Sequence, residues 1–96
     1  MENKPLFSLG QVVQTRGLYS KTENNPDRHN EVVEAFNKYV GGDWGNTCQE
    51  DAELNNEAVR TGEDRIVAKY CLSFGNIFII TEWDRSYTTL MLCEEY

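Results

Sequence analysis

The sequence lacks the segments on which several classes of protein depend. No apolar run approaches the roughly 18 residues that span a bilayer, and residues 1–9 contain no apolar stretch of the kind found in secretion signals. Neither of the two common glycine-rich phosphate-binding patterns is present. We therefore expect a cytoplasmic protein without a membrane anchor and without a nucleotide-binding loop.

Histidine and cysteine are scarce. His29 is the one histidine, and Cys48, Cys71 and Cys93 are too widely spaced to form a C-x-x-C pair. A zinc site would need all four residues to converge, and nothing in the pattern supports a Cys–His couple. An odd number of cysteines without an export signal predicts reduced thiols. We expect no metal, no cofactor and no catalytic residue.

Positive charge is nearly missing from residues 43–64. This segment has seven acids and one base, Arg60, and so carries six of the seven net negative charges of the chain. Phosphate backbones and anionic membranes should repel such a surface, so we expect no direct binding to nucleic acid or membrane. A basic partner protein is favoured instead, for example a DNA-binding defence complex. The sequence does not indicate the oligomeric state.

Length and composition predict a single α+β domain over residues 1–96. Residues 1–8 are expected to form a flexible tail. Residues 10–15 are typical of a short strand. Arg16 and Gly17 should end this strand, and residues 20–26 should form a polar surface loop.

A helix is expected next, capped by Asn25 with Pro26 in its first position. Gly41 should end it in the left-handed conformation. An apolar stripe with 3.6-residue spacing should face the core, formed by Val32, Val33, Phe36, Tyr39 and Val40.

A second helix is expected over residues 48–61, started by a capping box between Thr47 and Glu50 and ended by Gly62. Because it has few apolar residues, it should lie on the surface with one narrow inward face. Those apolar residues are Ala52, Leu54, Ala58 and Val59.

Three strands are expected over residues 65–73, 76–83 and 87–93, paired as an antiparallel meander with the middle one central. The element order is then β-α-α-β-β-β. We expect a small, mainly antiparallel sheet of four strands, with two helices packed on one face.

The acids of the second helix and the turn after it are the first candidate site. Six of them are proposed to bind a partner: Glu50, Asp51, Glu53, Glu57, Glu63 and Asp64. Helical spacing places Glu50, Glu53 and Glu57 on one face. One interpretation is a mimic of a row of DNA phosphates, and the other is a solvated face that keeps the protein soluble.

A second candidate site combines a glycine-rich loop with a turn. It would bind a small ligand or carry out catalysis through Asp43, Trp44, Glu82, Asp84, Arg85 and Thr88. The alternative is structural: Trp44 would close the edge of the core, and the turn would be held by local hydrogen bonds of Asp84 and Arg85.

Several stretches resemble a family of small plasmid-related proteins, carried by plasmids, phages and integrative elements of gut and related bacteria. The matching pieces are Leu-Gly-Gln-Val-Val at 9–13, Gly-Asp-Trp-Gly at 42–45, Glu50-Asp51 with Asn55, Gly-Glu-Asp-Arg at 62–65, Ile-Ile-Thr-Glu-Trp-Asp-Arg-Ser-Tyr-Thr-Thr at 79–89 and Glu-Glu-Tyr at 94–96. Residues 16–30 depart from the pattern, being longer and more polar.

The resemblance implies a mobile genetic element and no enzymatic class. Small acidic proteins of mobile elements include inhibitors of restriction and CRISPR nucleases, many of which block a DNA groove. By this analogy we expect a non-enzymatic interaction protein, and an anti-defence (anti-CRISPR or anti-restriction) DNA mimic is the specific form of that expectation.

Overall fold

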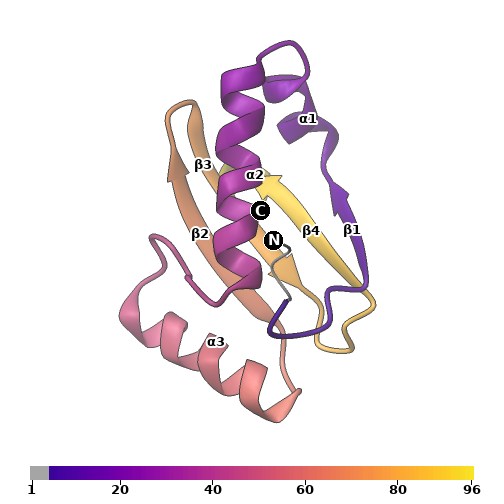
Figure 1. Cartoon of the computed structure of the whole chain (residues 1–96), viewed down its shortest axis with the longest axis vertical. Coiled ribbons are helices and arrows are strands. Elements are labelled where there is room, and N and C mark those ends of the chain that lie inside the picture. Colours follow the sequence, from indigo (N-terminus) through magenta and orange to yellow (C-terminus); the bar gives the residue numbers. More distant parts are fainter. Residues whose placement is uncertain (1–4) are drawn as a thin grey trace.

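The computed structural model describes residues 5–96, and Figure 1 shows its elements. The strands are β1 (Gln11–Gln14), β2 (Ile66–Leu72), β3 (Gly75–Thr81) and β4 (Tyr87–Leu92). Three helices, α1 (Arg16–Thr22), α2 (Pro26–Val40) and α3 (Gln49–Thr61), lie between β1 and β2 in the sequence, and a short 3-10 helix, η1 (Cys93–Glu95), follows β4. The α+β class is confirmed, with three helices instead of two.

The four strands form one mixed sheet in the order β1-β4-β3-β2. The antiparallel meander of β2, β3 and β4 is confirmed, with β3 inside the sheet, whereas β1 pairs parallel to β4. The path of the chain explains the parallel pair. Helix α2 returns the chain to the end of the sheet where β1 began, so β2 starts there too (Figure 1). Two hairpins then reverse the direction twice, and β4 runs the same way as β1.

Helix α1 occupies a segment that was predicted to be a strand end and a loop, so that prediction was wrong. Thr15 is its N-cap, and its hydroxyl accepts a hydrogen bond from Leu18 N at 3.3 Å. Leu18 and Thr22, one turn apart, are both buried. A Cβ on Gly17 would lie 2.4 Å from a carboxylate oxygen of Glu95, so Gly17 marks a place where α1 approaches the end of the Glu95 side chain and not a strand end.

Helix α2 begins as predicted, with the Asn25 side chain accepting from Arg28 N at 3.1 Å and Pro26 in its first turn. The inward stripe of α2 differs from the predicted one at one position, because Val33 is 42% exposed and Ala35 is buried instead. The helix ends before Gly41 as predicted, with Gly41 as its C-cap, but the predicted left-handed conformation of Gly41 was wrong. Gly41 has φ −93°, and the left-handed residue is Gly42, with φ +85°.

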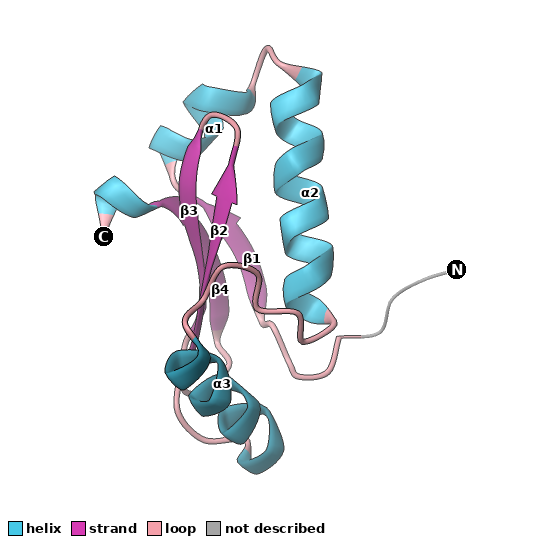
Figure 2. Ribbon diagram, turned by 90° about the vertical axis from the view of Figure 1, so that its left-hand side faces the viewer, coloured by secondary structure: helices cyan, strands magenta, loops and turns pink. Residues whose placement is uncertain are grey.

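The helices do not all cover the same face of the sheet. Helix α2 lies along one face, and α3 lies across one end of the sheet beside β2 (Figure 2). The expectation of two helices on one face therefore holds for α2 alone. The core between α2 and the sheet contains Leu18, Tyr39, Ile66, Ala68, Ile77 and Ile79, all fully buried.

The expected tail, residues 1–8, lies partly outside the described residues, which begin at position 5. Within the described part, Leu6 N donates to Val40 O at 3.0 Å. The ring of Phe7 meets that of Tyr39 edge-on, with centroids 5.4 Å apart, and packs against the core. Residues 6 and 7 are therefore part of the packed structure and not of a tail.

Candidate interaction surface

Helix α3 is attached to β2 through an asparagine. Asn55 is buried, and its side chain donates to Val67 O at 2.8 Å and accepts from Val67 N at 3.2 Å. It thus pairs with the outer edge of β2 as a neighbouring strand would. Ala58, nearly one turn later, is also buried. The inward face of α3 is therefore defined by Asn55 and Ala58, and Leu54, which was expected inside, is 64% exposed.

Three further outer groups of the β2 edge, Lys69 N, Lys69 O and Cys71 N, are satisfied by the loop before α3. Asn46 N donates to Lys69 O at 2.8 Å, and its side chain accepts from Cys71 N at 2.9 Å. The hydroxyl of Thr47 accepts from Lys69 N at 2.8 Å and donates to Trp44 O. Thr47 therefore makes no capping box with Glu50; Cys48 is the N-cap and makes no side-chain cap.

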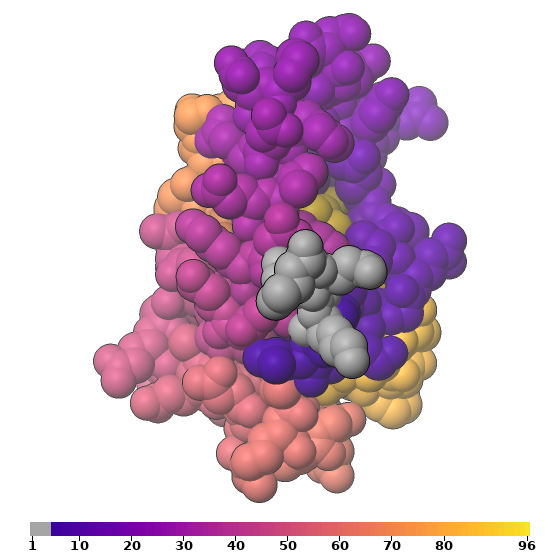
Figure 3. All heavy atoms as spheres, in the orientation of Figure 1, coloured from indigo at the N-terminus to yellow at the C-terminus, as the bar shows by residue number. Residues whose placement is uncertain are grey.

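The orientation of α3 determines where its acids point. Glu50, Glu53 and Glu57 share a helix face, because three- and four-residue steps return to the same side. Successive residues are rotated by roughly 100°, so this face is opposite Asn55 and Ala58. All six predicted partner-binding acids are exposed. Figure 3 shows α3 at one end of the molecular surface, away from α1.

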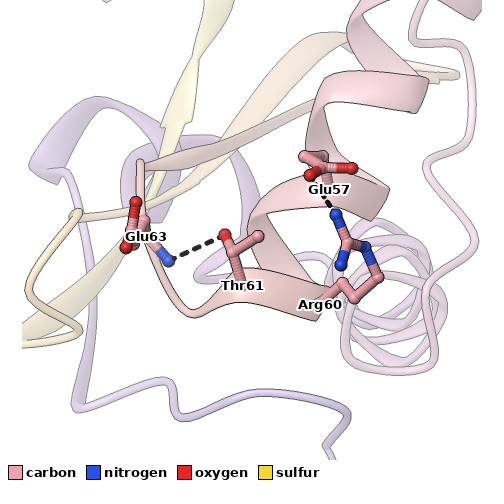
Figure 4. Close-up of polar contacts among 4 residues, drawn as sticks. All are labelled: Glu57, Arg60, Thr61 and Glu63. Atoms are coloured by element: carbon pink, nitrogen blue, oxygen red, sulfur yellow. Dashed lines mark hydrogen bonds and ion pairs between the residues drawn. The ribbon is translucent and has the colours of Figure 1, made fainter.

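The six acids form groups and not one uniform row. Glu50, Glu53 and Glu57 form the outer face, Asp51 lies on the flank beside Leu54, and Glu63 and Asp64 lie beyond the helix end. Only Glu57 has an ion-pair partner among the described residues, and that partner is Arg60 (Figure 4). Both side chains are more than half exposed, and such pairs contribute about 0–1 kcal/mol. The surface remains strongly anionic.

A groove of about 550 Å³ lies beside the outer face. One wall is α3, and the floor comes from the sheet face that α2 does not cover. Apolar groups are supplied by Leu54, Val67, Phe78 and Tyr96, and the charged residues along it are Asp51, Glu57, Asp64 and Arg65. Residues from four separate segments meet here. We call this feature the α3 groove.

Asp43 and Trp44, from the second candidate site, are engaged within the fold. The Asp43 carboxylate accepts from Gly45 N at 3.0 Å, closing a local turn. Trp44 is 6% exposed, and its indole N–H donates to Asn56 Oδ1 at 2.8 Å. Its ring also packs edge-on against Tyr39. This geometry matches the structural interpretation, in which Trp44 closes the core.

The turn between β3 and β4 is also held internally. Asp84 Oδ1 accepts from Ser86 N at 3.0 Å, and hydrogen bonding from the side chain and the backbone of Ser86 keeps the pKa of the Asp84 carboxyl below its usual range. Arg85 donates to the carbonyls of Asp64, Glu82, Trp83 and Ala58. The Ala58 carbonyl is near the C-terminal end of α3, where a positively charged group is favourable. The Arg85 guanidinium ties this turn to α3 and to the segment that follows it.

Thr88 is fully buried at the end of a chain of hydroxyl groups. Its hydroxyl donates to Leu9 O at 2.7 Å, so it accepts from Thr81 at 2.8 Å. The Thr81 hydroxyl is also hydrogen-bonded to the Tyr39 hydroxyl at 2.7 Å, and the Tyr39 hydroxyl donates to Ile66 O at 3.1 Å. Burial raises the pKa of Tyr39 well above its ordinary value. The chain satisfies three buried hydroxyls, and it links α2, β3, β4 and the segment before β1.

The structure therefore separates the residues of the second candidate site. Asp43 and Trp44 lie in the loop that borders the β2 edge, whereas residues 82–86 form the β3–β4 turn near the end of α3 and Thr88 lies in β4. The α3 groove was not predicted, although the sequence carried a signal for it. Phe78 alternates with the buried Ile77 and Ile79 on a strand predicted to be apolar on both faces, so it had to lie on the face away from α2.

Residues 5–96 contain neither a metal-binding cluster nor a membrane-spanning helix. No group of three or more His, Cys, Asp or Glu side chains in this part of the chain is arranged to hold a metal ion. The thiols of Cys48, Cys71 and Cys93 are free. None of the described helices has both the length and the apolar content needed to cross a bilayer.

Comparisons with known proteins do not assign a family. No family model matches the chain, and neither a curated protein nor a solved structure matches it.

Proposed function

We propose that this chain is a non-enzymatic acidic interaction protein of a mobile genetic element, and that it binds a basic partner protein through α3. The observation that carries the proposal is the exposure of Glu50, Glu53 and Glu57 on the face opposite the buried side of α3. Asp51, Glu63 and Asp64 extend the negative surface around it.

The ligand-binding or enzymatic alternative has less support. The Trp44 and Arg85 side chains and the Thr88 hydroxyl are all occupied by hydrogen bonds within the chain. A catalytic group needs free hydrogen-bonding capacity within reach of a substrate, and these groups have little.

Charge reversal tests the proposal. In the variant E53K/E57K, two cations replace two anions on the outer face, so capture of a partner from host extract should be lost. The matched control is E23K/E34K, with the same change of charge at exposed positions of the α1–α2 region, and it should capture normally. Wild-type capture should weaken steeply above about 0.1 M salt, where charges are screened within about 10 Å. Unchanged capture by E53K/E57K would reject the proposal.

The DNA-mimic form of the proposal is narrower. From Glu50 to Glu57 the axial rise is about 10 Å, equal to about three base-pair steps of a duplex. The outer face therefore imitates only a short piece of DNA. If mimicry is the mechanism, the protein should compete with a DNA duplex for the captured restriction or CRISPR complex. A partner that binds duplex and this protein together would exclude mimicry and leave the interaction itself in place.

A further inference from the structure

The α3 groove differs from the outer face in having a large apolar component. Leu54 is 64% exposed and Tyr96 is 63% exposed, and both line the same depression. Val67 and Phe78 lie half-buried between them. The Tyr96 and Phe78 rings are 5.2 Å apart, and Arg65 donates to the Tyr96 hydroxyl at 2.9 Å, which holds the ring over the floor. Apolar side chains gathered in a concave surface are typical of a docking site.

The groove also has a charged margin. Asp51 and Glu57 contribute from α3 and Asp64 from the turn after it, against one base, Arg65. An occupant must therefore offer apolar surface to the floor and positive charge to the margin. A second copy of this chain does not meet this requirement, because it would bring a second net charge of −7 to the same place. Anionic ligands such as nucleic acids are disfavoured for the same reason.

We propose that the α3 groove binds an amphipathic cationic segment of the partner protein. One large apolar or aromatic side chain would lie against Leu54, Phe78 and Tyr96, while neighbouring Lys or Arg side chains of the same segment pair with Asp51, Glu57 and Asp64. This inference rests on the proposed function and specifies the partner's binding element. The α3 groove also adds contact area to the outer face, which is only about 10 Å long.

The probe is a synthetic helix-forming peptide of about 16 residues, long enough for partial helicity, with Leu and Trp on one side and Lys and Arg on the other. A second peptide has the same composition with the apolar residues dispersed around the helix. Binding to the whole chain is measured by fluorescence anisotropy at low salt, and amide shifts are followed by NMR. The amphipathic peptide should bind about tenfold more tightly and should shift Leu54, Val67 and Phe78.

Variants of the protein identify the surface. Leu54→Ser should weaken binding of the amphipathic peptide about tenfold, because an exposed apolar contact is removed. Val33→Ser is the matched control, since Val33 is exposed on α2 outside the groove. Asp51→Asn with Asp64→Asn should reduce both the affinity and its salt dependence.

Two results would overturn the inference. One is equal affinity for the two peptides with no effect of Leu54→Ser, which would mean that charge alone drives binding. The other is absence of binding by the amphipathic peptide at low salt. In either case, loss of host-partner capture by E53K/E57K would still support the proposed function. Failure of the inference about the α3 groove can therefore be distinguished from failure of the proposed function.

Discussion

Arg85 has a left-handed backbone, with φ +61°, a conformation that glycine usually supplies in tight turns. Its presence is explained by its side chain, which donates to four backbone carbonyls in two parts of the chain. One residue thus shapes the β3–β4 turn and holds the end of α3. The candidate residues of this turn serve the fold.

Substitution separates the two roles of Arg85. Arg85→Ala should lower the free energy of unfolding by about 1–3 kcal/mol, because the hydrogen bonds from the charged guanidinium are lost. The energetic cost of the left-handed backbone stays, since alanine is also disfavoured in that conformation. Arg85→Gly should be less damaging by about 0.5–1 kcal/mol, because glycine accepts the left-handed backbone. Denaturant titration of both variants measures this, and equal stability of Arg85→Ala and wild type would contradict the assignment.

Gly45 illustrates a close approach of loop and strand. It has φ +62°, and a Cβ would lie 2.4 Å from the Tyr70 ring. Gly45→Ala should therefore destabilise the fold by about 2 kcal/mol or more. Gly41→Ala is the control, because Gly41 has an ordinary φ and its Cβ would meet only atoms 3.6 Å or more away. Similar melting temperatures for the two variants would show that the loop moves freely.

Among the elements, α3 depends most on a polar anchor. It buries Asn55 and Ala58 and few large apolar side chains, so packing alone holds it weakly. Asn55 compensates by pairing with both backbone groups of Val67. The acids of α3 gain a defined direction from this anchor, since rotation of the helix would break both hydrogen bonds.

Asn55→Ala should lower the free energy of unfolding by about 1–3 kcal/mol, because Val67 N and O lose their partners. It should also weaken partner capture at equal protein concentration, because the acids of α3 would no longer be held in place. Asn56→Ala is the comparison, as Asn56 is exposed and bonds the Trp44 indole instead. Hydrogen exchange at Val67 provides a local readout, and unchanged protection there would contradict the role of Asn55.

At the scale of the whole molecule, two carboxylates connect separate segments and a third closes a local turn. Glu31 of α2 accepts from Ser73 N and Oγ, and Glu95 accepts from Leu92 N and the Thr15 hydroxyl. Asp84 closes its own turn. These hydrogen bonds hold the pKa of each of the three below its ordinary value, which is 4.5 for Glu and 3.8 for Asp.

The sign of the pH dependence follows from these directions. A carboxyl with a lowered folded-state pKa stabilises the fold above its unfolded pKa, and this contribution is lost as pH falls through the folded value. Unfolding should therefore become easier as pH falls below about 4.5, the ordinary Glu value. Glu31→Gln should destabilise the protein at pH 7, and the difference should shrink in strong acid. Melting curves against pH test this, with Glu34→Gln as the α2 control; a constant difference would contradict it.

Much of the fold could be predicted because it depends on local patterns. Asn25 and Pro26 start α2, Gly62 ends α3 in the left-handed conformation, and alternation along residues 66–72 separates the two faces of β2. Helix α1 was missed because Gly17 was interpreted as the end of a strand. The capping box failed because Thr47 bonds β2, a partner distant in sequence.

The sequence by itself determined that α3 carries the negative charge and that Glu50, Glu53 and Glu57 share one of its faces, because helical periodicity and side-chain ionisation are local properties. Only the tertiary structure decided which way that face points and what lies beside it. Asn55 sets the rotation of α3 through Val67. The sheet topology then brings Phe78 and Tyr96 next to Leu54, and these contacts join segments that are far apart along the chain.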